Sequence, residues 1–113
     1  MNETVQTELK KIFNGRFSTS ESTRSNYARG EDTYNPILSK AVVFPETNEE
    51  VSQILKICNE HKIPVVPFGT GTSLEGHVVG NQNGITISLE KMNKVLSVNA
   101  EDFDCRVQAN VTR

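Results

Sequence analysis

The stretch Ile63-Pro64-Val65-Val66-Pro67-Phe68-Gly69-Thr70-Gly71-Thr72-Ser73-Leu74-Glu75-Gly76-His77 decides how this chain folds. An apolar run leads directly into a segment rich in glycine and hydroxyl residues. Glycine adopts positive φ without cost and has no Cβ to hold a ligand away. Consecutive backbone amides in such a turn converge into a concavity that binds anions, and Thr70, Thr72 and Ser73 add hydroxyl donors. The loop contains no Lys or Arg, so backbone dipoles would hold a phosphate here, which suits the diphosphate of a buried cofactor.

The same residues also fit a plain turn between two strands, because Gly, Ser and Thr are turn formers in their own right. Spacing alone leaves both interpretations open. Two well-known phosphate fingerprints are absent. Gly69, Gly71 and Gly76 are spaced G-x-G-x-x-x-x-G rather than G-x-G-x-x-G, and no Gly-Lys-Ser/Thr is present.

The segment before this stretch predicts a strand and then a helix. Residues 40–44 form a short apolar run that ends at Pro45, as a short buried strand would. Thr47, followed three residues later by Glu50, forms a capping box that predicts the start of a helix. One face of that helix, which ends near His61, carries the apolar residues Val51, Ile54, Leu55 and Cys58.

Strand, capped helix and strand make a β-α-β unit, and such crossovers join parallel strands. The second strand is Ile63 to Phe68, so the glycine loop leaves the carboxyl end of a parallel strand. Open α/β sheets bind their ligands at that end of the strands. This context favours the phosphate-loop interpretation over the plain turn.

The remaining segments predict further strands and an N-terminal extension. Glu3 to Asn14 has the periodicity of an amphipathic helix packed on the domain, and Gly15 is a natural stop. Ser18 to Arg29 reads as a surface loop with a turn of helix near Glu21 to Tyr27. Beyond the glycine loop, alternation predicts a polar turn at 80–84, a half-buried strand over 85–89, a strand over 95–98, an acidic turn at 101–104 and a last strand over 105–109.

Composition sets limits on the function. The chain has 113 residues, which is one domain or part of one. A net charge of −2 without a basic cluster argues against a nucleic-acid surface. Cys58 and Cys105 lack metal-ligand spacing, so we expect buried, inert thiols and no metal site. No apolar run approaches the ~20 residues of a membrane span, and the N-terminus lacks a signal-type apolar core.

Several stretches together resemble a known family. They are residues 27–34, 41–45, 64–76, 89–96 and 107–113, and the string Pro-Phe-Gly-Thr-Gly-Thr-Ser-Leu-Glu-Gly is the most specific of them. They resemble the flavin domain of the FAD-linked oxidases of the vanillyl-alcohol oxidase and p-cresol methylhydroxylase group. Within it, they are most similar to cytochrome-type D-lactate dehydrogenases and the FAD-bearing glycolate oxidase subunit. Relatives usually have Gly where Asn110 stands, and Asn tolerates the left-handed conformation that such a turn would need.

The resemblance implies an α+β (α/β-like) fold in which an N-terminal helix precedes a β-α-β unit and further strands, the first subdomain of a p-cresol methylhydroxylase-type FAD-binding domain. Residues 1–39 would form a helix-and-loop extension, and 40–113 the FAD-binding domain, incomplete at its C-terminus. The implied cofactor-binding residues are Pro67, Phe68, Gly69, Thr70, Gly71, Thr72 and Ser73 near the diphosphate and Gly76 and His77 on the flavin side. A structural role at a strand edge is the alternative for His77. Some relatives attach FAD covalently through a His where Thr72 stands here, so we expect non-covalent FAD.

The resemblance also implies an activity: a 2-hydroxy acid such as D-lactate or glycolate gives a hydride to the flavin, and an acceptor such as a cytochrome or quinone takes the electrons. The family's catalytic histidines and arginine are expected beyond residue 113, so no catalytic residue is predicted here, and this segment alone is expected to be inactive. The alternatives are a truncated module that binds FAD or another diphosphate without catalysis, and a fragment that cannot close its core. A cytoplasmic or peripheral inner-membrane setting is expected.

Overall fold

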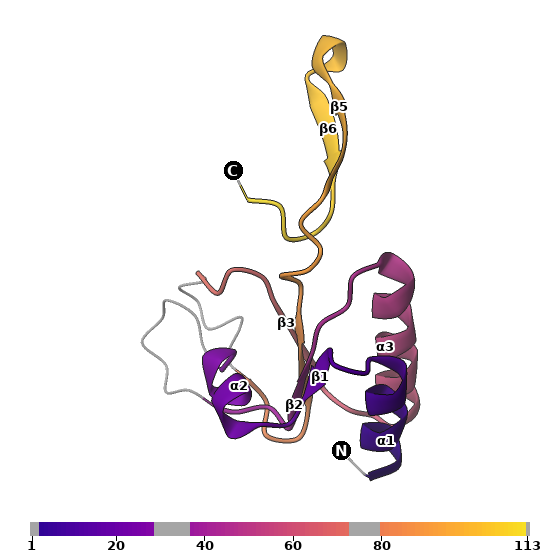
Figure 1. Ribbon diagram of the computed structural model, residues 1–113, viewed down its shortest axis with the longest axis vertical. Helices are drawn as coiled ribbons and strands as arrows, with labels where there is room; N and C mark the ends of the chain where they lie inside the picture. The colour runs from indigo at the N-terminus through magenta and orange to yellow at the C-terminus, as the bar shows by residue number, and fades with distance from the viewer. Residues whose placement is uncertain (1–2, 29–36, 73–79, 113) are drawn as a thin grey trace.

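The computed structural model describes residues 3–28, 37–72 and 80–112 (Figure 1). Its elements are α1 (Glu3–Ile12), β1 (Phe17–Ser18), α2 (Glu21–Asn26), β2 (Ala41–Val43), α3 (Asn48–Glu60), β3 (Val65–Phe68), β4 (Ile85–Ser88), β5 (Val95–Asn99), the 3-10 turn η1 (Ala100–Asp102) and β6 (Asp104–Val107). These helices and strands confirm the expected α+β fold. Within the described ranges, no helix is long and apolar enough to cross a bilayer.

The main sheet has four strands in the order β1-β2-β4-β3. β4 is parallel to both β2 and β3, so the predicted strand–helix–strand unit does join parallel strands, with β4 inserted between them. β1 adds antiparallel to the outer edge of β2. The sequence placed Ser18 in a surface loop and did not predict this strand. The N-terminal extension therefore contributes a strand to the sheet that contains β2, β4 and β3.

α1 and α3 cover one face of the sheet, and α2 lies on the other (Figure 1). The core between α1, α3 and the sheet contains Val5, Leu9, Phe13, Ala41, Val43, Ile54, Ile57, Cys58, Ile63, Ile85 and Ile87. In α3 the buried side chains are Ile54, Ile57 and Cys58, whereas Leu55 is 46% exposed. Of the apolar face predicted for this helix, Ile54 and Cys58 are buried, whereas Val51 and Leu55 line an open groove.

The strand predicted at residues 85–89 is present as β4, but the prediction that it is half-buried was wrong. All four residues of β4 are buried, including Thr86 and Ser88. The cause is tertiary, since β4 is a central strand and Ser39, from the chain before β2, lies against its second face. The Thr86 hydroxyl is satisfied there by the Ser39 hydroxyl at 2.8 Å. The alternation of apolar and polar residues in β4 indicates that its two faces differ in polarity, but it does not indicate that the polar face is exposed to solvent.

An ion pair ties the N-terminal extension to the start of α3. Thr47 caps the helix as predicted, its Oγ1 accepting a hydrogen bond from the Glu50 amide at 3.2 Å. The reciprocal bond of a capping box is displaced by one residue, because Glu50 Oε1 accepts from the Glu46 amide at 2.8 Å. Arg16 also binds Glu50 with two nitrogens, at 2.8 and 2.6 Å. Above all, the hydrogen bond from Arg16 lowers the pKa of Glu50 to about 2.

We expect this ion pair to make the fold sensitive to acid. A carboxylate whose pKa is lower in the folded than in the unfolded state stabilises the fold above the unfolded pKa. Its contribution is lost as the pH falls from about 4.5 toward about 2. Because the Glu50 and Arg16 side chains are 21% and 23% exposed, we expect Glu50→Gln to lower the free energy of unfolding by on the order of 2 kcal/mol at pH 7.

Urea titrations at pH 7 and at pH 2.5 test this expectation, because the difference between wild type and Glu50→Gln should shrink strongly at the lower pH. Glu49→Gln is the matched control, since Glu49 is exposed in the same turn of α3. An equal effect of both substitutions, or a difference that does not depend on pH, would contradict the role of the ion pair.

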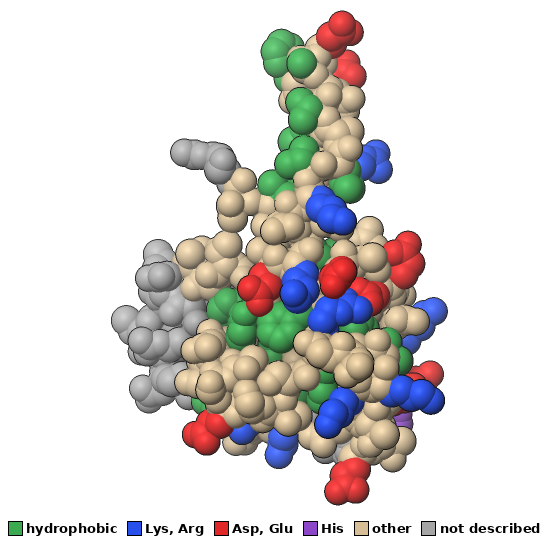
Figure 2. All heavy atoms as spheres, viewed as in Figure 1, with side chains coloured by type: hydrophobic (Ala, Val, Ile, Leu, Met, Phe, Trp, Pro, Cys, Tyr) green, Lys and Arg blue, Asp and Glu red, His purple; other side chains and the backbone are tan. Residues whose placement is uncertain are grey.

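β5 and β6 form a separate two-stranded antiparallel hairpin that projects from the body of the molecule (Figure 1). Figure 2 shows apolar side chains along it, and five large ones are exposed: Val95, Leu96, Val98, Phe103 and Val107. The predicted last strand ends at Val107, two residues earlier than expected. Cys105 lies on this hairpin and is exposed, so the prediction that both thiols are buried holds for Cys58 alone. Burial raises the pKa of the Cys58 thiol to about 11.

Candidate functional site

The carboxyl ends of the three parallel strands meet at one edge of the main sheet. Phe44 follows β2, Phe68 ends β3, and Glu90 comes shortly after β4. The glycine loop begins at this edge, where open α/β sheets bind ligands. The predicted location of the loop relative to the strands is therefore confirmed.

The loop adopts the backbone conformation for which glycine is needed. Gly71 has φ +75°, in the left-handed region. A Cβ at this position would lie 2.5 Å from Cζ of Phe68, so the ring of Phe68 packs directly against the Gly71 backbone. The loop thus folds back over the last residue of β3.

The described part of the loop, residues 69–72, offers amides to a ligand. Within the part of the chain that the structure describes, the backbone N–H groups of residues 69–72 donate no hydrogen bond. Thr70 and Thr72 are exposed, and their hydroxyl oxygens lie 3.3 Å apart. Unpaired amides beside two hydroxyls match the donor set that a diphosphate requires. The residues present therefore fit a diphosphate-bearing cofactor.

Asn110 closes one side of the loop. Its side-chain oxygen would lie 3.1 Å from a Cβ at Gly69, so the two residues are in contact. The Asn110 amide donates to the Met92 carbonyl at 2.9 Å. Among the described residues, the non-glycine positions with positive φ are Lys62 and Phe103. Asn110 therefore does not use the left-handed conformation that the sequence comparison with Gly suggested, and its side chain faces the loop instead.

Tyr27 is a residue at this edge that the sequence analysis did not single out. Its ring makes edge contacts with Phe44 and Phe68, at centroid distances of 5.5 and 5.0 Å. Its hydroxyl donates a hydrogen bond to the Glu90 carboxylate. Burial, with that hydrogen bond second, raises the pKa of Tyr27 to about 12. The phenol is therefore a neutral donor at physiological pH. The only hint in the sequence was the likeness of residues 27–34 to the family.

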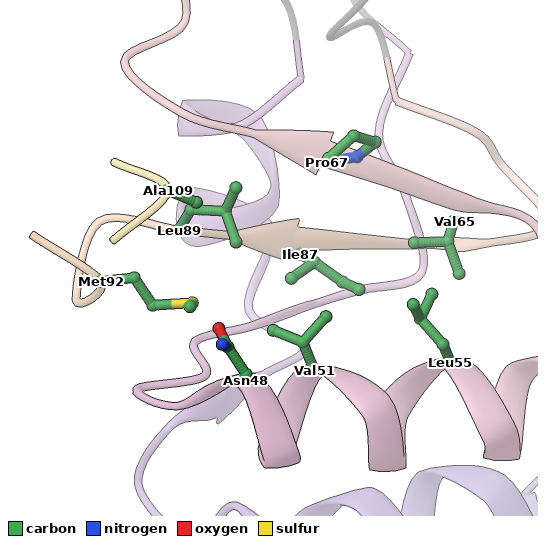
Figure 3. A pocket seen from close by; sticks show the side chains of 9 residues that line it. All are labelled: Asn48, Val51, Leu55, Val65, Pro67, Ile87, Leu89, Met92 and Ala109. Atoms are coloured by element: carbon green, nitrogen blue, oxygen red, sulfur yellow. The ribbon is translucent and has the colours of Figure 1, made fainter. Parts of the chain in front are cut away.

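An apolar groove lies between α3 and the main sheet (Figure 3). Its volume is about 560 Å³, and it is lined by Asn48, Val51, Leu55, Val65, Pro67, Ile87, Leu89, Met92 and Ala109. No lining side chain carries a positive charge. Desolvation of a diphosphate without compensating donors is costly, so the groove does not suit that group.

Pro67 and Phe68 point to opposite faces of the sheet, as neighbouring residues in a strand do. Pro67 faces the apolar groove (Figure 3), whereas Phe68 faces Tyr27. Of the predicted cofactor-binding residues, Phe68, Gly69, Thr70, Gly71 and Thr72 lie together in the described part of the loop. Ser73, Gly76 and His77 lie outside the described residues. Among the described side chains, no group of three or more His, Cys, Asp or Glu is arranged to hold a metal ion.

Comparison with known sequences identifies the family. The profile of an FAD binding domain matches residues 39–113, which include the glycine loop and the hairpin. The chain belongs to this family of FAD-binding domains. FAD is accordingly its cofactor, as the sequence predicted.

Curated relatives are oxidoreductases. The chain is 43% identical over 96 residues to the probable mitochondrial D-lactate dehydrogenase of Danio rerio, an alignment that covers 85% of this chain and 19% of the relative. It is 35% identical over 106 residues to the mitochondrial D-lactate dehydrogenase [cytochrome] of Arabidopsis thaliana, covering 92% and 19%. It is 33% identical over 95 residues to the glycolate oxidase subunit GlcD of Bacillus subtilis, covering 84% and 20%. The chain thus spans about a fifth of the length of these relatives.

Solved structures confirm the fold. An alkyldihydroxyacetonephosphate synthase matches 98% of this chain and 23% of its own with a TM-score of 0.87 at 19% identity. A p-cresol methylhydroxylase matches 89% of this chain and 21% of its own with a TM-score of 0.71 at 22% identity. The chain therefore has the fold of the p-cresol methylhydroxylase-type FAD-binding domain.

Proposed function

We propose that this chain is the diphosphate-holding part of an FAD-dependent oxidoreductase that oxidises a 2-hydroxy acid, D-lactate or glycolate. The observation that carries the proposal is the set of amides of residues 69–72, which donate no hydrogen bond within the described residues and lie at the carboxyl edge of the parallel strands, in a chain whose relatives are D-lactate dehydrogenases and a glycolate oxidase subunit. Bound FAD would supply the hydride acceptor.

In this proposal the loop residues bind and orient the cofactor. The amides of Gly69–Thr72 donate to the diphosphate, and the hydroxyls of Thr70 and Thr72 add donors without adding charge. Phe68 supports the loop because its ring packs against the Gly71 backbone. Pro67, Ser73, Gly76 and His77 stay proposed contacts. Thr72 offers no nucleophilic imidazole, so the attachment is proposed to be non-covalent.

Anaerobic reduction of the flavin tests the proposal. The full-length protein that contains this segment is purified, its flavin spectrum is recorded, and D-lactate, glycolate or L-lactate is added. We expect bleaching of the flavin absorbance near 450 nm by D-lactate or glycolate and much slower bleaching by L-lactate. No bleaching by any 2-hydroxy acid would contradict the proposed activity.

A diphosphate-binding module without catalysis is the second candidate, favoured by the amide and hydroxyl donors of residues 69–72 in a chain for which no catalytic residue is predicted. The same experiment separates the two, because such a module would retain flavin that no substrate bleaches.

The proposed partners are the small 2-hydroxy acid and an electron acceptor such as a cytochrome or quinone. The word cytochrome in the name of the Arabidopsis relative supports the former acceptor. A cytoplasmic or peripheral inner-membrane setting is the proposed location, although the names of the Danio and Arabidopsis relatives place those proteins in mitochondria. Fractionation of the native protein between soluble, membrane and mitochondrial extracts tests it.

A further inference from the structure

Tyr27 is the residue that connects the three parallel strands at the edge where the loop begins. It contacts Phe44 after β2, Phe68 at the end of β3 and Glu90 after β4. It lies at the C-terminal end of α2, outside the segment that the FAD-binding family profile matches. A side chain from the N-terminal extension therefore connects the end of β3 with the residues that follow β2 and β4.

The contact with Phe68 reaches the loop directly. The Tyr27 and Phe68 rings meet edge to face, with 76° between their planes. The Phe68 ring also occupies the space that a Cβ at Gly71 would need. Phe68 is 7% exposed, so its ring has little room to move away from either neighbour. The position of Tyr27 thus sets the position of the ring on which Gly71 rests.

Ala28, the residue after Tyr27, is hydrogen-bonded to Gly80, which follows the loop in the sequence. The Gly80 amide donates to the Ala28 carbonyl at 3.0 Å. Gly80 is buried and packed so closely that a Cβ would lie 2.1 Å from the Ile37 carbonyl oxygen. Tyr27 and Ala28 therefore contact the two residues, Phe68 and Gly80, between which the loop segment runs.

We propose that Tyr27 is a positioning residue for the cofactor loop: its ring holds Phe68 against Gly71, and Ala28 beside it holds the chain at Gly80. The proposal rests on the proposed function, because the loop that Tyr27 orders is the one that would hold the FAD diphosphate. It assigns the N-terminal extension a part in cofactor binding in addition to its packing on the core. Preorganised donors bind more tightly, because less conformational entropy is lost on binding.

Apoprotein reconstitution measures the effect on FAD affinity. In the full-length protein, Tyr27→Leu removes both aromatic edge contacts and the hydroxyl, and we expect the FAD dissociation constant to rise about tenfold or more. Tyr27→Phe keeps both ring contacts and loses the hydroxyl with its hydrogen bonds to Glu90 and Ser88, so the constant should stay within about threefold of wild type. Rescue by the conservative variant separates ring positioning from loss of the hydroxyl.

Phe13→Leu is the matched control. Phe13 is a fully buried aromatic residue of the same N-terminal extension, and it packs in the core on the opposite face of the sheet. We expect this variant to lose thermal stability with an FAD dissociation constant within about threefold of wild type. An unchanged constant in Tyr27→Leu, or an equal rise in Phe13→Leu, would overturn the positioning role.

A measurement without cofactor keeps this proposal separate from the proposed function. Hydrogen exchange at two bonded amides reports the order of the loop edges in the 113-residue chain itself: the Gly80 amide, which donates to the Ala28 carbonyl, and the Leu89 amide, which donates to the Phe68 carbonyl. We expect Tyr27→Leu to exchange faster there by about tenfold, and Phe13→Leu to match wild type at these amides. If the wild-type protein holds no FAD, the proposed function fails, and equal exchange in Tyr27→Leu and wild type would still overturn the role of Tyr27.

Discussion

Gly71→Val is expected to reduce the flavin content of the full-length protein to below about a tenth of wild type, since a loss of ~1.4 kcal/mol already weakens binding tenfold. Two effects act together. Gly71 has φ +75°, which costs a β-branched residue more than the ~1–2 kcal/mol typical of L-residues in this region. The new side chain would also displace the Phe68 ring, because its Cβ would lie 2.5 Å from Cζ. The amides of residues 69–72 would then be displaced from their positions.

Absorbance at the flavin maximum, normalised to protein after gel filtration, measures the effect. Gly15→Val is the matched control, because Gly15 has φ +79° and nothing lies within 4 Å of its Cβ position. Both variants carry the same kind of backbone strain, but Gly15 follows α1 and lies outside the loop. Normal flavin content in Gly71→Val would remove the loop from the cofactor site, and loss of flavin in both variants would attribute the effect to general destabilisation.

Gly84→Ala is expected to destabilise the fold by about 3 kcal/mol or more, at the upper end of the range for overpacked sites. A Cβ at Gly84 would lie 2.2 Å from the Pro64 carbonyl oxygen, which is backbone and cannot rotate away. The same carbonyl accepts a hydrogen bond from the Ile85 amide at 3.0 Å, and the Gly84 carbonyl accepts one from the Lys40 amide at 2.8 Å. The substitution would therefore push the start of β4 away from β3.

Urea unfolding of the 113-residue chain, followed by circular dichroism, measures this loss. Gly69→Ala is a suitable control, since its Cβ would lie 3.1 Å from the movable side-chain oxygen of Asn110, and we expect less than about 1 kcal/mol. A free energy of unfolding for Gly84→Ala within about 0.5 kcal/mol of wild type would show that the strands separate easily at this point.

Much of the local structure could be predicted because its causes lie within a few residues of one another. The Thr47 cap places the start of α3, since an N-cap side chain bonds an amide three residues ahead. The glycine at position 71 predicts a positive φ, because that backbone conformation is sterically unfavourable for residues with a Cβ. Strand, helix and strand imply parallel pairing, and hence a loop at the carboxyl edge of the sheet. The resemblance of residues 67–76 to the family motif predicted FAD as the ligand of this loop.

The features that were missed depend on contacts between residues far apart in the chain. Glu50 binds Arg16, 34 residues away, in addition to the Glu46 amide just before its own helix, because the guanidinium offers two donors at once. Thr86 and Ser88 are buried because a second layer covers the polar face of β4. Cys105 is exposed because the hairpin that carries it extends away from the core.

The chain's own order of residues is therefore enough to predict the helices, the parallel strands and the glycine loop, since each depends on short-range hydrogen bonding and sterics. The insertion of β4 between β2 and β3, the burial of both faces of β4 and the meeting of Tyr27 with Phe44, Phe68 and Glu90 required the folded molecule. The physical reason is that pairing order and layer coverage are set by which apolar surfaces bury one another, and no local pattern encodes that choice.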